Sequence, residues 1–223
     1  MPDYIRSGRL AGILFLVALG ANLVGSELLD AIVIAPDYLS QTYAQKTSVI
    51  LGMLAEIASA IAVVGIGVCL YPVLREHSQT VALGYLAFRL IEPMITIIIV
   101  LSSLSILALS REFMAAGATD PGQYALLGTL FQTTRDWALM IYILIFCTGA
   151  FLFYSLLFRT RLVPRLLSVW GLVGAAILLA GALIDMLITD IPPEAYGAVM
   201  GVNEIVFPLW LTFKGFNTRP ARV

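Results

Sequence analysis

Long apolar runs constrain the fold of this chain more than any other feature of its sequence. Six of them span residues 10–29, 48–71, 80–110, 124–158, 165–188 and 194–213. A helix of about 20 apolar residues crosses the roughly 30 Å hydrocarbon core of a bilayer. Because lipid offers no hydrogen-bond partner to backbone N–H and C=O groups, such runs fold as helices. The sequence predicts an all-α polytopic membrane protein, a bundle of six transmembrane helices forming a single domain over residues 1–223.

The composition narrows the classes of function. Hydrophobic residues make up 60% of the chain, charged residues make up 12%, and the net charge is −1. A balance of this kind gives no basic surface for a nucleic-acid partner. Zinc sites need clustered Cys and His, whereas Cys69 and Cys147 lie in separate apolar runs and His77 is the single histidine. We expect no nucleic-acid partner, no metal site and no cofactor, and the sequence identifies no cofactor-binding residue.

The basic residues predict an orientation. The positive-inside rule places the connections that are richer in Lys and Arg in the cytoplasm. Of the connections outside the apolar runs, one side holds only Lys46 and Arg111. The other side, which includes both termini, holds Arg6, Arg9, Arg75, Arg159, Arg161, Arg165, Lys214, Arg219 and Arg222. We therefore expect both termini in the cytoplasm.

Ionisable residues inside the apolar runs are the second unusual feature. Such side chains cost several kcal/mol in lipid unless they are paired or hydrated, so they mark functional sites by default. Tyr85, Arg89 and Glu92 follow one another at spacings of four and three residues, which places them on one face of a helix. Glu56 and Glu204 lie in other runs. One arginine near three glutamates leaves carboxylates that hold a proton or a cation.

Two prolines add to this pattern. A proline inside a helix leaves the carbonyl four residues earlier without its donor, so Pro93 and Pro208 free the carbonyls of Arg89 and Glu204. Because no polar stripe can face lipid, the stripes of several helices should converge on the interior of the bundle. The predicted ligand-binding residues on these stripes are Glu56, Tyr85, Arg89, Glu92, Gln132, Arg135, Asp136, Asn203 and Glu204.

Three functions fit these residues. The first is an outward-accessible intramembrane pocket that binds a small ligand, cation or proton. A version of this hypothesis adds transport of the bound species. The second is an accessory subunit whose buried charges only lock helix packing, which predicts a dry, mutually satisfied cluster. The third is an enzyme acting on a lipid-like substrate, which predicts a lateral opening beside Glu92 or Glu204. No nucleophile–base pair stands out, so no catalytic residue is assigned. The expected partners are the lipid bilayer, the small ligand, and in one arrangement a second copy of the chain.

Several short motifs resemble those of a bacterial membrane family known as domain-of-unknown-function family 4386. The likeness covers most of the chain and is carried by "RLAGILFLVA" at 9–18, "APDYLS" at 35–40, "LGYLAFRLIE" at 83–92, "RDWA" at 135–138, "LVPRLLSVWGL" at 162–172, "NE" at 203–204 and "KGFN" at 214–217. The resemblance implies a small multi-helix protein of the bacterial cytoplasmic (inner) membrane. It implies no activity, so no functional residue follows from it.

Overall fold

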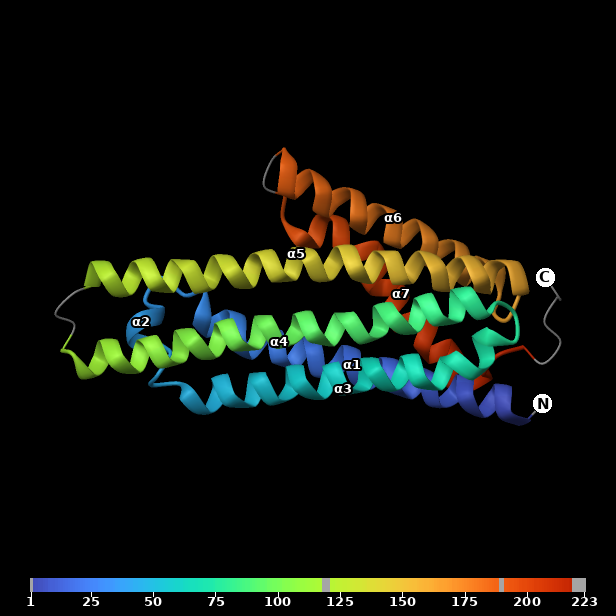
Figure 1. Ribbon diagram of the computed structural model, residues 1–223, viewed down its shortest axis with the longest axis horizontal. Coiled ribbons are helices and arrows are strands. Elements are labelled where there is room, and N and C mark those ends of the chain that lie inside the picture. The colour runs from blue at the N-terminus through green and yellow to red at the C-terminus, as the bar shows by residue number, and fades with distance from the viewer. Residues whose placement is uncertain (1, 118–120, 189–190, 218–223) are drawn as a thin grey trace.

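The computed structural model of the chain describes residues 2–117, 121–188 and 191–217 (Figure 1). The described chain is helical, as predicted, and six of its helices are long and apolar enough to cross a membrane. Most of these helices extend beyond the apolar runs, because polar residues at their ends continue the same backbone hydrogen bonding. The elements are α1 (Pro2–Val33), α2 (Tyr38–Gln41), α3 (Lys46–Arg75), α4 (Gln79–Ala115), α5 (Pro121–Thr160), α6 (Arg165–Leu187) and α7 (Pro193–Lys214).

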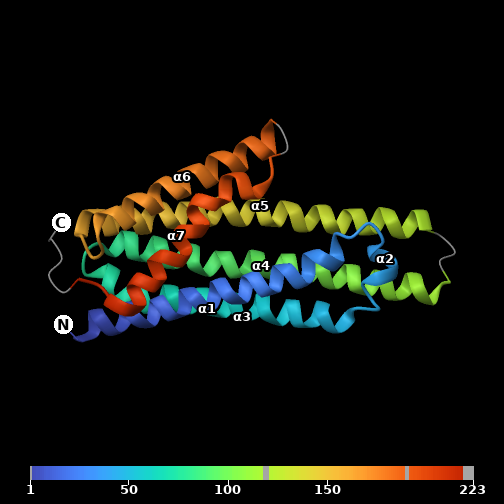
Figure 2. The same cartoon turned by 180° about the vertical axis from the view of Figure 1, so that it is seen from behind.

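The six long helices pack as a ring. Each helix in the order α1, α3, α4, α5, α6, α7 packs against the next one, and α7 returns to pack against α1. Helices α1 and α7 meet at the end of the bundle where α1 begins (Figure 2). Toward the other end, α6 and α7 form a shorter hairpin that diverges from the four remaining helices (Figures 1 and 2). The ring of six helices therefore occupies the terminal part of the bundle, and α1, α3, α4 and α5 continue beyond the hairpin toward the opposite end (Figures 1 and 2).

Small residues bring these helices close together. A Cβ atom at Gly12 of α1 would lie 2.5 Å from Thr212 Oγ1 of α7, and one at Gly181 of α6 would lie 2.2 Å from the Cβ atom of Tyr196. Neither position accepts a larger side chain without a shift. Close backbone approach at small residues is the usual way in which helices associate in lipid.

The helices differ in length. Helix α5 has 40 residues and α4 has 37, whereas α6 has 23. At 1.5 Å per residue, α4 and α5 measure about 55–60 Å and are longer than one membrane crossing requires. Helix α4 continues through Pro93 and α7 continues through Pro208. The two prolines that the sequence marks therefore lie inside unbroken helices.

The short helix α2 lies across the end of the bundle remote from the termini (Figures 1 and 2). Ser110 of α4 holds this segment, because its hydroxyl donates to the carbonyl of Leu39 at 2.7 Å and accepts from the backbone N–H of Tyr43 at 2.9 Å. The ring of Tyr38 packs directly on Gly128 of α5. The segment thus ties α4 and α5 to the connection between α1 and α3.

Candidate intramembrane site

The polar stripe of α4 forms the centre of the site. The guanidinium of Arg89 donates to the carboxylate of Glu92 at 2.8 Å and to the hydroxyl of Tyr85 at 2.9 Å. All three residues are buried, with 6%, 1% and 1% of their surface exposed. The guanidinium also packs on the rings of Phe15 and Phe146, whose centroids lie 5.2 and 5.7 Å from its central carbon. Arg89 and Glu92 therefore form a neutral pair held in place by an aromatic shell.

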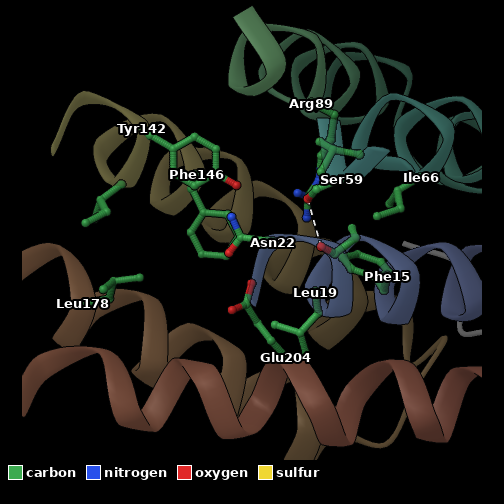
Figure 3. A pocket seen from close by; sticks show the side chains of 13 residues that line it. Phe15, Leu19, Asn22, Ser59, Ile66, Arg89, Tyr142, Phe146, Leu178 and Glu204 are labelled. Carbon is green, nitrogen blue, oxygen red and sulfur yellow. Dashed lines mark hydrogen bonds between the residues drawn. The ribbon is translucent and has the colours of Figure 1, made fainter. Parts of the chain in front are cut away.

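A central cavity of about 150 Å³ lies beside this pair (Figure 3). Each of the six long helices contributes to its wall. In Figure 3, Arg89 and Glu204 point into the cavity from opposite walls. The carboxylate of Glu204 makes no hydrogen bond with any other described residue. One water needs about 10–15 Å³ of such a volume, so the cavity has room for several waters or a small ligand.

A second cavity, of about 260 Å³, lies on the side of the remote end. Its wall contains Glu56, whose two carboxylate oxygens accept from the amide of Asn22, each at 3.3 Å. The two cavities share wall residues, which are Asn22, Ser59, Val63 and Tyr142. The two cavities therefore adjoin, and together they extend from Asp30 and Arg135 to Glu204.

Arg135 of α5 lines the second cavity and forms an ion pair with Asp30 of α1. Its neighbour Asp136 has an exposed side chain and lines neither cavity. Gln132 also lies outside both cavities, where its amide donates to the carbonyl of Val33 at 2.7 Å. Of the three candidates that the sequence places on α5, only Arg135 contributes to a cavity wall.

Asn203 supports the site and does not line either cavity. Its side chain is fully buried, and its carbonyl oxygen accepts from the hydroxyl of Tyr154 at 2.6 Å. Its amide nitrogen is buried without a hydrogen-bond partner among the described residues. The contact joins α5 to α7 one residue before Glu204, so it positions that carboxylate.

The charges along this wall do not balance. Arg89 and Arg135 each have a carboxylate partner. Glu56 and Glu204 have no cationic partner, since the ion pairs of the described chain do not include either residue. Within the described part, no group of three or more His, Cys, Asp or Glu residues is arranged to hold a metal ion. Two unpaired carboxylates in cavities with room for water can hold protons or a cationic group.

The wall residues that sequence reasoning missed include Asn22, Asp30 and Tyr142. Asn22 interrupts an apolar run, and that signal could have identified it. Asp30 lies just beyond the same run, where solvation at the membrane rim explains an acidic residue equally well. Tyr142 resembles any aromatic residue of a membrane helix, because its direction depends on how α5 is rotated.

Comparison with known proteins gives one match. The family model described as Domain of unknown function (DUF4386) matches residues 10–215. No curated protein and no solved structure matches the chain. The match covers the whole ring of helices and both cavities.

Proposed function

The chain belongs to the DUF4386 family, whose description states no activity, and we propose that this member binds a small cation, organic or inorganic, in its central cavity. Glu204 is the carboxylate that receives the cation. The neutral pair of Arg89 and Glu92 shapes the opposite wall, and Glu56 supplies a second negative charge along the connected wall. If the protein also transports the cation, the cation moves between the carboxylates of Glu204 and Glu56.

One observation carries the proposal: Glu204 faces a cavity without a hydrogen bond or a cationic partner from the described residues. An ionised carboxylate in a membrane interior is costly unless water, a proton or a cation compensates it. The alternative of a purely structural charge lock predicts that each buried charge is satisfied by another side chain. Arg89 and Glu92 fit that description, whereas Glu204 does not, so the ligand site is the better-supported function.

The experiment compares two carboxylate variants in lipid nanodiscs. Methylammonium and Na⁺ serve as probes, and the midpoint of thermal unfolding is measured over a range of probe concentrations. A ligand at 100 times its Kd stabilises the folded state by about 2.7 kcal/mol. We expect such stabilisation in the wild type and in Asp136→Asn, whose carboxylate lies outside the cavities, and its loss in Glu204→Gln. Equal stabilisation of all three proteins, or of none, contradicts the proposal.

We also propose that both termini face the cytoplasm of a bacterial inner membrane. The asymmetry of Lys and Arg supports this orientation. The described C-terminal helix ends at Lys214 at the same end of the bundle as the start of α1 (Figure 1). Fusions of a periplasmically active phosphatase test it: activity should appear after residue 117 and be absent after residue 217. The reverse pattern refutes the orientation.

A further inference from the structure

The cavity walls contain a junction that the ring does not close tightly. Helices α1 and α5 both line the two cavities. They do not pack extensively against each other, since each packs on its own neighbours in the ring. Helix α7 lies along α1 at the terminal end and then crosses away with α6 (Figure 2). Two contacts bridge α1 and α5 toward the remote end, the ion pair of Arg135 with Asp30 and the hydrogen bond from Gln132 to Val33. The loosely packed junction lies between these contacts and the place where α7 crosses away.

Side chains along this junction are accessible from the side. Asn22 of α1 is exposed although it lines both cavities, and Leu139 of α5 is 39% exposed although it lines the second cavity. Glu204, across the central cavity, is half-buried. Because this part of the ring lies within the membrane-spanning segments, an opening between α1 and α5 leads into the bilayer.

The wall next to this opening is apolar. Leu19 of α1, Ile143 of α5 and Leu178 of α6 line the central cavity near its polar residues. Pockets that are mostly apolar with a few placed polar groups bind molecules that combine an apolar body with a polar end. A small hydrophilic cation would leave these side chains without a partner.

We infer that the central cavity takes an amphiphilic amine, a cationic ammonium head with an apolar chain, which enters from the lipid between α1 and α5. The head lies at Glu204, and the chain lies along Leu19 and Leu139 toward the bilayer. This inference rests on the proposed function and specifies its substrate class. An anionic amphiphile is disfavoured, because the charge of Arg89 is already neutralised by Glu92 at 2.8 Å while Glu204 and Glu56 are unpaired.

Ser59 is not arranged to act as a nucleophile on such a molecule. The serine of the shared wall, Ser59, donates its hydroxyl to the backbone carbonyl of Ala18 at 2.8 Å. A serine nucleophile needs a side-chain base that accepts its proton, and none occupies that place here. A lateral opening is common to this inference and to the enzyme alternative, and the inference concerns entry and binding alone.

The experiment measures binding of four probes by calorimetry on protein-loaded nanodiscs, with empty nanodiscs as the blank. Octylammonium has the head and the chain, ethylammonium has only the head, octanol lacks the charge and octanoate reverses it. We expect octylammonium to bind at least tenfold more tightly than each of the other three, and Glu204→Gln to abolish this preference. Equal binding of ethylammonium and octylammonium overturns the inference and leaves the proposed cation site intact. If neither octylammonium nor ethylammonium binds, both the inference and the proposed cation site are overturned.

Two tryptophan variants of α5 test the route. Leu139→Trp fills the opening, whereas Ile141→Trp changes a residue of the same helix that is 48% exposed and lines neither cavity. We expect Leu139→Trp to weaken octylammonium binding at least tenfold and Ile141→Trp to change it less than twofold. If Leu139→Trp does not fold, Leu19→Trp is a second variant that fills the same opening. Unchanged binding in a folded filled variant overturns lateral entry.

Discussion

Two glutamates of the site, Glu92 and Glu204, should respond in opposite ways to the same substitution. Glu92 is 1% exposed and accepts from Arg89 at 2.8 Å, whereas Glu204 makes no hydrogen bond with another described residue. Replacement by glutamine keeps the shape of the side chain and removes its charge. The comparison therefore separates a carboxylate that stabilises the fold from one that is available to a ligand.

The magnitude follows from the ion pair. Two unit charges 2.8 Å apart attract by about 6 kcal/mol at an effective dielectric constant of about 20. The loss is smaller than this, because a glutamine oxygen still accepts from Arg89. Breaking a buried pair costs about 3–5 kcal/mol, so we expect Glu92→Gln to lower the free energy of unfolding by about 3 kcal/mol. Glu204→Gln removes an unpaired charge and should leave stability unchanged or raise it by up to about 1 kcal/mol.

Cys147 provides the assay. It is fully buried, and with Cys69 replaced by alanine it is the sole thiol of the chain. A thiol-reactive fluorophore then labels the protein only as it unfolds, and the midpoint of labelling against temperature gives the stability of each variant. A loss in Glu204→Gln as large as that in Glu92→Gln would refute the reasoning, since it would mean that Glu204 also holds the fold together.

Two further predictions concern packing and hydrogen bonding around the site. Gly181→Ala should lower the free energy of unfolding by about 1–3 kcal/mol, because its new methyl group would meet the Cβ atom of Tyr196 at 2.2 Å. The matched change Gly20→Ala has nothing within 4 Å and should raise stability by up to about 1 kcal/mol. Equal effects of the two changes would contradict the expectation. Tyr154→Phe should cost about 1–3 kcal/mol, since it removes the 2.6 Å hydrogen bond to Asn203 and leaves that amide without a partner. The same thiol-labelling midpoint measures this loss, and an unchanged midpoint would show that the amide is satisfied in another way.

The sequence predicts the helices well because lipid leaves the backbone no alternative. Each apolar run corresponds to one long helix, and the stripe of Tyr85, Arg89 and Glu92 forms within a single helix, where spacing alone determines which side chains meet. Contacts inside one helix are local, so their prediction needs no knowledge of the fold.

Contacts between helices could not be predicted in the same way. Arg135 and Asp136 are adjacent and point about 100° apart on a helix, so at most one of them faces the interior. Spacing does not say which one, and the rotation of α5 directs Arg135 toward Asp30 while Asp136 is exposed. The periodicity within a single run also does not predict the order of the helices around the ring. For that reason the contribution of α1 to the cavity walls, through Asn22 and Asp30, could not be placed from the runs alone, although Asn22 interrupts an apolar run.

The meeting of α1 with α7 has a consequence for biosynthesis. Helix α1 leaves the ribosome before α7, on which it packs, and α7 carries Glu204. Until the translocon inserts α7, the flank of α1 that packs on it is covered only by lipid. The wall of the central cavity therefore stays incomplete until α7 is inserted, and a product that stops before α7 lacks the wall that carries Glu204.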